Sequence, residues 1–484
     1  MYKPSFICHK MIENFRENDY HPSSAMKNET KLNKHPVGSF LQISSLCLPL
    51  ILSLLSGSLM GFCDRIFAGM VSEEALEGLA IATYLVLLFQ VACIRISSTS
   101  QVFVTSYLAK GEKNECGVYT WQMIWFSLLS MLLIYPIGFG TSFIAFPQTP
   151  SGELGRTYFS IMMGGIFLYP LGATLGAFFI GQGKTHIISS ITLISHALNI
   201  GLNYLLIFGW HPLISPMGVK GAAYATLLSQ GVYSTTLFLL FLREKYQPFG
   251  NHLWKMKKAP FQACLKVGIP RALARFSALL AWNASVYFIN FKGESYLIVL
   301  SVGSSIFLLI SCFNEGMGQG LITFFSYLKE RGSIHLVRKG IKMSFIFLTL
   351  SFLMVGIPLV LYPDVLIRLF VHQNLTQDTF STLKFSLIGL WIFFWFEGYA
   401  WIGLSMLTAL GKTLYLLKMN LIINWPTIFL PIFLGIYVGD WGADKIWFIC
   451  SLSCITAGTL CLMKGLRHFL NSDEKLLEGA LQHS

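Results

Sequence analysis

Long apolar segments constrain this chain of 484 residues more than any other feature of its sequence. An apolar run of 18 or more residues with few charges is long enough to cross a lipid bilayer as a helix. Only 12% of the residues are charged, whereas a soluble domain uses about 25% to keep its surface in water. We therefore expect a polytopic membrane protein rather than a soluble protein with a large core. The predicted spans are residues 40–63, 76–108, 118–140, 156–182, 186–208, 218–243, 267–290, 295–328, 341–362, 381–410, 414–438 and 446–464.

The basic residues between these spans are distributed unequally. An even number of spans puts both ends of the chain on one side, and most Lys and Arg fall in the segments on that side, including Lys110, Lys184 and Lys412. Positive charge marks the cytoplasmic face of a membrane protein. We therefore expect a multi-pass protein of the cell (inner) membrane with both termini in the cytoplasm. This distribution also accounts for the formal net charge of +12 without a nucleic-acid partner.

The two halves of the chain repeat each other. Six helices followed by six indicate parallel repeats that are related by an axis along the membrane normal. The sequence thus predicts an all-α membrane fold of twelve transmembrane helices in two six-helix lobes related by a pseudo-two-fold axis. Three tripeptides of the first half have counterparts at matching places of the second, 220 to 228 positions later: Leu48-Pro49-Leu50 with Ile269-Pro270-Arg271, Ser106-Tyr107-Leu108 with Ser326-Tyr327-Leu328, and Gly183-Lys184-Thr185 with Gly411-Lys412-Thr413.

The domain boundaries follow from the spans and from the polar segments around them. No phosphate-binding loop or other nucleotide motif is present in the sequence, and the ten cysteines show no zinc spacing. We therefore expect neither an enzyme nor a bound cofactor. The predicted parts are a disordered cytoplasmic tail (1–39), an N-lobe of helices 1–6 (40–243), a cytoplasmic linker (244–266), a C-lobe of helices 7–12 (267–466) and a second cytoplasmic tail (467–484).

Of the 23 acidic residues, three are expected well inside spans: Asp64, Glu315 and Glu397. An ionised carboxylate in hydrocarbon is costly, so such a residue faces a cavity, pairs with another group or exchanges protons. The alternative for a carboxylate near a helix end, such as Asp64, is that it reaches water at the membrane interface. Glu397 lies far from both ends of its span, which makes that alternative weaker there.

Two stretches of the first half carry a resemblance to a known family. Pro49, Asp64 and Gly69 are similar to the Pro…Asp…Gly opening of the multidrug and toxic compound extrusion (MATE) family. Residues 183–209 resemble the fifth helix of that family, and residues 217–226 resemble the start of its sixth. The resemblance implies a secondary active antiporter that exports small organic cations and drugs in exchange for H⁺ or Na⁺. It also implies a protein that acts as a monomer.

The resemblance assigns the coupling ion to the N-lobe. It implies a cation site formed by Asp64 on the first helix, Asn199 and Asn203 on the fifth, and Thr226 on the sixth. From the residues alone, Asn199 and Asn203 lie on one face of a helix, where hydrogen bonding between helices is the simpler interpretation. Asn203 stands where the family often carries Asp. One carboxylate offers Na⁺ less charge than two, which favours proton coupling over Na⁺ at Asp64.

The C-lobe departs from the family pattern at one acid and keeps another. Ala278 occupies a position of the seventh helix where many members carry Glu, while Glu397 matches the acid of the tenth helix. Glu397 is therefore a candidate for binding a proton or a cationic substrate.

Arg95 and Glu315 occupy equivalent positions in the second and eighth helices, because each precedes its Ser-Tyr-Leu motif by the same number of residues. Equivalent residues approach each other near a two-fold axis. We hypothesise an ion pair that links the lobes; the alternative is two unrelated residues that face water.

Two other functions compete with drug export. A lipid-linked oligosaccharide flippase of the same superfamily would need a cavity rich in Arg or Lys for pyrophosphate, and the sequence offers Arg95, Arg271 and Arg275. A membrane receptor or scaffold without transport leaves the duplicated halves and the acids within spans unexplained.

Overall fold

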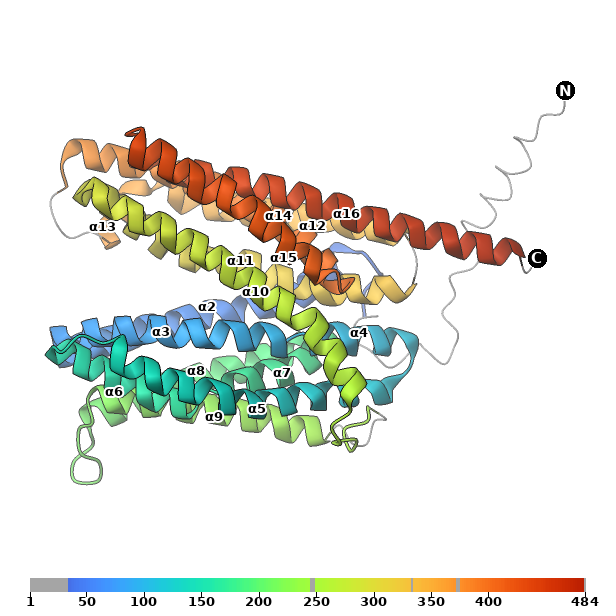
Figure 1. The fold of residues 1–484 in the computed structure, drawn as a ribbon, viewed down its shortest axis with the longest axis horizontal. Coiled ribbons are helices and arrows are strands. Elements are labelled where there is room, and N and C mark those ends of the chain that lie inside the picture. Colours follow the sequence, from blue (N-terminus) through green and yellow to red (C-terminus); the bar gives the residue numbers. More distant parts are fainter. Residues whose placement is uncertain (1–33, 244–248, 332–333, 371–374, 483–484) are drawn as a thin grey trace.

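The computed structural model describes residues 34–243, 249–331, 334–370 and 375–482. Within these ranges the regular secondary structure is helical, with one isolated bridge between Trp210 and Ile214 in place of any β-strand. Two bundles lie side by side, one built from the first half of the chain and one from the second (Figure 1). The predicted tail at residues 1–39 lies largely outside the described residues.

The first half of the chain forms the N-lobe. Its helices are α2 (Phe40–Val71), α3 (Glu73–Ser97), α4 (Ser100–Lys110), α5 (Lys113–Ile144), α6 (Pro150–Gly164), α7 (Leu168–Gly181), α8 (Thr185–Phe208) and α9 (Val219–Arg243).

The second half forms the C-lobe. Its helical segments are α10 (Lys258–Ile289), η4 (Asn290–Lys292), α11 (Glu294–Arg331), α12 (Ile334–Gly356), η5 (Ile357–Leu361), α13 (Pro363–Phe370), α14 (Gln377–Ala409), α15 (Thr413–Asn424), η6 (Trp425–Phe429), η7 (Ile432–Val438), η8 (Ala443–Lys445) and α16 (Ile446–Gln482).

Length and composition confirm twelve spans. Eleven helices in the described part of the chain are long and apolar enough to cross a membrane, and the bent pair of α6 and α7 makes a twelfth. Helices α3 and α4 together make one of these spans, Glu73–Lys110.

Three of the boundaries expected from the sequence differ in the structure. The span expected at 76–108 is interrupted between Ser97 and Ser100, and the span expected at 156–182 bends by 48° between α6 and α7. The predicted linker is shorter than 244–266, because α10 already begins at Lys258. Pro260 then lies in the first turn of a helix, where its missing N–H leaves no hydrogen bond unmade.

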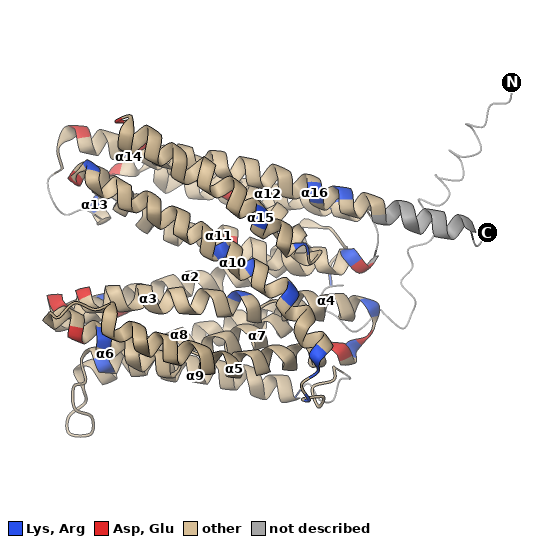
Figure 2. Ribbon diagram, in the orientation of Figure 1, with Lys and Arg blue, Asp and Glu red and all other residues tan. Residues whose placement is uncertain are grey.

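The ends of the helices differ in charge. Lys and Arg gather where α4 ends and α10 begins, whereas Asp and Glu are frequent where α3 begins (Figure 2). We call the first of these ends the basic face, defined by Lys110, Lys113, Lys184, Lys257 and Lys412, and the other end the opposite face. The chain passes between the two faces with each span.

The lobes share a hydrophobic core only in the half of the molecule nearest the basic face. One cluster of buried side chains there combines residues of both lobes, such as Ile43 and Val104 with Leu321 and Met406. Toward the opposite face, each lobe has its own cluster, around Phe159 in the N-lobe and around Trp447 in the C-lobe. The lobes are therefore joined mainly near the basic face.

Small residues allow α2 and α11 to approach closely at this junction. A Cβ added to Gly316 of α11 would stand 2.6 Å from Ile51 Cγ1 and 2.8 Å from Ile51 N on α2. A Cβ added to Gly320 would stand 2.7 Å from Cys47 Sγ. Close approach of backbones through small residues is how helices gain contact area inside a membrane, where the hydrophobic effect between helices is absent.

Gly316→Ala is expected to destabilise the joined lobes by about 1–3 kcal/mol, the usual cost of forcing an extra carbon into a packed site. The backbone of Ile51 cannot rotate away from the new methyl group. The measurement is the thermal unfolding midpoint of the purified protein in detergent. The matched control is Gly231→Ala on α9, where a Cβ meets nothing within 4 Å. Equal midpoints for Gly316→Ala and the wild type would contradict the packing argument.

Candidate functional site

Asp64 lies on α2 about two turns before that helix ends at the opposite face. Its Oδ1 accepts a hydrogen bond of 2.5 Å from Asn203 Nδ2 on α8. Asp64 is half-buried, and Asn203 is fully buried. The carboxylate is thus held by one fixed donor and keeps acceptor capacity for a further partner.

A chain of hydrogen bonds continues from Asn203 into the N-lobe. Asn203 Nδ2 also donates to Asn199 Oδ1 at 3.0 Å, one helical turn away. Asn199 Nδ2 donates to Thr226 Oγ1 at 3.4 Å and to Ser229 Oγ at 3.3 Å, both on α9. The structure therefore brings Asp64, Asn199, Asn203 and Thr226 into one network, which we call the Asp64 cluster.

One acceptor of the Asp64 cluster has no partner. Asn203 Oδ1 is buried and receives no hydrogen bond from any described residue. A buried polar oxygen without a partner costs about 1–3 kcal/mol. Carboxylate and amide oxygens are the ligands of hard cations, so Asn203 Oδ1 beside Asp64 suits a proton carrier such as hydronium or a bare Na⁺ ion.

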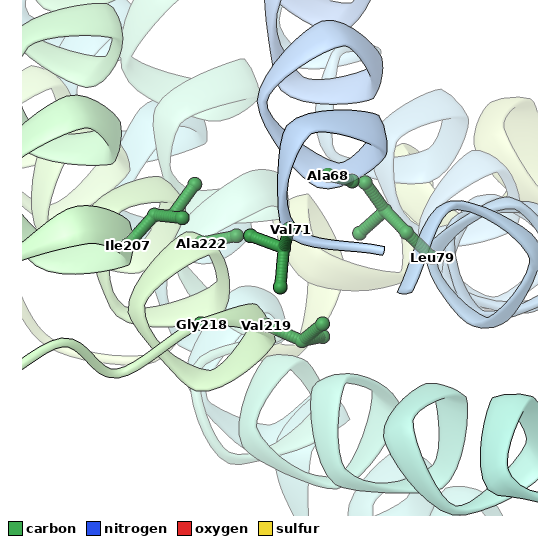
Figure 3. Close-up of a pocket in the computed structure, with 7 residues that line it drawn as sticks. All are labelled: Ala68, Val71, Leu79, Ile207, Gly218, Val219 and Ala222. Atoms are coloured by element: carbon green, nitrogen blue, oxygen red, sulfur yellow. The ribbon is translucent and has the colours of Figure 1, made fainter. Parts of the chain in front are cut away.

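Apolar residues one helical turn beyond the Asp64 cluster, toward the opposite face, line a small pocket between α2, α3, α8 and α9 (Figure 3). We call these residues the apolar layer. No charged side chain contributes to it, so an ion would not cross it readily. Its residues are Ala68, Val71, Leu79, Ile207, Gly218, Val219 and Ala222.

Glu397 occupies the middle of α14 and has partners on both carboxylate oxygens. Asn314 Nδ2 of α11 donates to Oε2 at 2.8 Å, and Trp401 Nε1 donates to Oε1 at 3.4 Å. Asn314 also donates to the carbonyl oxygen of Phe394 at 2.9 Å. Asn314 was not among the site residues expected from the sequence, although it is a second polar residue directly before Glu315 within an apolar span.

Arg95 and Glu315 meet between the lobes. Arg95 Nη2 on α3 donates to Glu315 Oε1 on α11 at 2.7 Å, and the side chains are 13% and 29% exposed. The Arg95 guanidinium carbon also lies 5.9 Å from the centre of the Trp401 ring. Arg95 therefore contacts Glu315 directly and lies near Trp401, which itself donates to Glu397.

Two further groups at these sites were not found from the sequence. Ser229 adds a second hydroxyl acceptor for Asn199, and its signal is a small polar residue one turn after Thr226. Tyr158 of α6 is buried and lies close enough to Asp64 to interact with its charge. Among the described residues no group of three or more His, Cys, Asp and Glu is arranged to hold a metal ion.

A larger cavity of about 330 Å³ lies away from these polar groups, between α12 and α14. Its lining is apolar except for Thr349 and includes Phe352 and Trp395. It offers no charge to bind an ion.

Comparison with protein families supports the relation suggested by the motifs. The MatE family model matches residues 49–205. A probable multidrug resistance protein NorM from Thermotoga maritima is 26% identical over 357 residues, which are 69% of this chain and 73% of the relative. A protein of the same name from Bacillus cereus is 25% identical, over 49% of this chain and 53% of the relative.

Solved structures share the fold at lower sequence identity. A MOP superfamily transporter from Pyrococcus furiosus superposes with a TM-score of 0.80 and 16% identity, over 90% of this chain and 97% of its own. An outward-facing multidrug resistance MATE family transporter gives a TM-score of 0.77 and 17% identity, over 89% and 96% of the two chains. The arrangement of twelve helices in two lobes is therefore confirmed.

Removing one partner of the Arg95–Glu315 pair is expected to destabilise the protein by about 2–3 kcal/mol. This lies between the values for exposed pairs and fully buried ones, because both side chains are only partly exposed. Arg95→Gln and Glu315→Gln should each lower the thermal unfolding midpoint in detergent, and the exchange Arg95→Glu with Glu315→Arg should recover part of the loss.

The control for this cycle is Lys384→Gln, which breaks an exposed pair with Asp364 at the opposite face. It should cost less than about 1 kcal/mol. An exchange variant as unstable as the less stable single variant would show that the charges do not interact favourably.

Proposed function

We propose that this chain, which belongs to the multidrug and toxic compound extrusion (MATE) family, is a secondary active antiporter that exports small organic cations in exchange for H⁺ or Na⁺. It is a transporter rather than an enzyme and requires no cofactor. It acts as a monomer in the cell (inner) membrane, with the basic face in the cytoplasm and both termini on that side. The positive-inside rule supports this orientation.

The observation that carries this proposal is the Asp64 cluster. A half-buried carboxylate next to an amide oxygen without a partner attracts a cation, and the amide network through Asn199 keeps both oxygens in place. The apolar layer beyond the cluster blocks direct passage of that ion across the lobe. The ion therefore does not pass straight through the lobe, and its transfer from one side of the membrane to the other requires a rearrangement of the lobes, as alternating access does.

Alternating access follows from differential binding. The lobes share one core near the basic face and have separate cores toward the opposite face, which suits an arrangement closed to the cytoplasm. Ion binding at Asp64 stabilises one arrangement of the lobes, and solute binding stabilises the other. A ligand shifts such an equilibrium only by its difference in affinity for the two states.

The coupling ion follows from the number of carboxylates. Asp64 is the one carboxylate of its cluster, with Asn199, Asn203, Thr226 and Ser229 as neutral neighbours. Na⁺ requires several oxygen ligands and gains from a second negative charge, whereas a proton requires one carboxylate. We therefore propose H⁺ as the coupling ion. In the C-lobe, Glu397 binds the cationic solute or a second proton.

The relatives do not favour the flippase. The similar proteins of Thermotoga maritima and Bacillus cereus are named as multidrug resistance proteins, and small organic solutes fit that description.

Ethidium efflux from cells that lack their own pumps tests the function. The wild type should expel ethidium when a proton gradient is imposed, and Asp64→Asn should reduce the rate by at least tenfold because the group that carries the proton is gone. The matched control is Glu153→Gln, which removes an exposed carboxylate from α6. An Asp64→Asn variant as active as the wild type would remove Asp64 from the coupling mechanism.

Asn203→Asp tests the choice of ion. A second carboxylate beside Asp64 should raise the affinity for Na⁺, because it adds a negative charge to the same oxygens. We expect ethidium efflux by this variant to respond to an imposed Na⁺ gradient to which the wild type responds weakly. If the wild type already follows the Na⁺ gradient and ignores the proton gradient, the assignment of H⁺ is wrong.

A further inference from the structure

A group of arginines lies beside the Arg95–Glu315 pair. Arg271 Nη1 of α10 donates to Ser98 Oγ, just beyond the end of α3, at 3.2 Å. Arg275 follows one helical turn later on the same face of α10. Both are close enough to Arg95 and Glu315 for direct electrostatic interaction. Two guanidinium groups of the C-lobe thus lie beside an ion pair that already contains a third, Arg95 of the N-lobe.

The carboxylates of this group are already engaged. Glu315 pairs with Arg95, and Glu397 accepts hydrogen bonds from Asn314 and Trp401. In the described part of the chain, neither Arg271 nor Arg275 has a carboxylate within ion-pair distance. Three guanidiniums against two carboxylates leave a formal charge of 3 − 2 = +1 between the lobes.

Unpaired guanidiniums within spans are costly, because charge in an apolar environment needs a partner. Arg271 is half-buried, while Arg275 is exposed and has no hydrogen-bond or ion-pair partner among the described residues. The N–H groups of Arg275 are therefore free to bind a solute that reaches the Arg95–Glu315 pair. An anion that binds there would offset the repulsion between Arg271, Arg275 and Arg95.

The chemistry of the arginines narrows the choice of anion. A guanidinium is planar and binds a carboxylate through two parallel hydrogen bonds. A single negative charge matches the surplus of +1, whereas a pyrophosphate with about three charges would exceed it. We propose that Arg271 and Arg275 bind a carboxylate group of the transported solute. The transporter then accepts carboxylate-bearing organic solutes as well as organic cations.

This inference deepens the proposed function and rests on it, since it names part of what the antiporter carries. Binding of a solute at this site would also affect how the two lobes are arranged. Arg271 and Arg275 belong to the C-lobe, and Arg95 belongs to the N-lobe. A carboxylate between them reduces the repulsion across the junction and so stabilises the arrangement in which the lobes are joined there.

Two dyes that differ only at a carboxylate test the site. Rhodamine 110 carries a free carboxylate, and rhodamine 123 is its methyl ester. Their affinities for the purified full chain in detergent are measured by fluorescence anisotropy. Arg275→Gln should raise the Kd of rhodamine 110 about tenfold, through loss of a charge-assisted contact. The Kd of rhodamine 123 should stay the same or fall, because a positive charge has been removed near a cation.

Two variants keep this test specific. Arg275→Lys retains the charge but loses the pair of parallel hydrogen bonds, so its Kd for rhodamine 110 should lie between those of the wild type and Arg275→Gln. Arg368→Gln removes an exposed guanidinium from α13 at the opposite face and should change neither Kd. Equal changes for both dyes in Arg275→Gln, or no change for rhodamine 110, would overturn the proposal. If the wild type still exports ethidium, such an outcome rejects the carboxylate site but not the antiporter function. If the wild type exports no ethidium, the antiporter function itself is wrong.

Discussion

The cost of placing charge inside a membrane governs this structure. Within the spans, each acid has a defined environment: Asp64 has Asn203, Glu397 has Asn314 and Trp401, and Glu315 has Arg95. Donors or opposite charges around such a group reduce the cost of keeping it in an apolar environment. The acids deep inside the spans are therefore concentrated in the Asp64 cluster and near the junction between the lobes.

The junction combines two kinds of contact with different properties. Near the basic face, apolar packing and close helix approach at Gly316 and Gly320 hold the lobes together. Farther along, the contacts are polar, as in Arg95–Glu315 and the hydrogen bond between Tyr84 and Asn283. Polar contacts exchange partners with an ion or a solute far more easily than packed apolar surfaces separate. The two lobes are thus coupled firmly at one end and adjustably toward the other.

The two halves are not identical, and the differences bear on function. The N-lobe has breaks in its second and fourth spans, after Ser97 and after Gly164, whereas α11 and α14 are continuous. The C-lobe instead has π-helical segments in its ninth and eleventh spans. A shared ancestral pattern was therefore adapted differently in each lobe, with the Asp64 cluster in one and the Glu397 group in the other.

The sequence by itself determined the protein class, the number of spans, the duplication and the identity of the intramembrane acids. The reason is that the bilayer sets the length of each apolar segment and the side on which basic residues lie, and both are properties of short stretches of sequence. The i, i+4 spacing of Asn199 and Asn203 also placed both on one helix face. Only the tertiary structure decided which donors meet which acceptors. Asn314 reaches Glu397, Ser98 reaches Arg271, and Asn203 Oδ1 is left without a partner because these groups come from different helices. Such contacts depend on helix rotation and breaks, which apolar periodicity in a nearly uniform hydrophobic span does not specify.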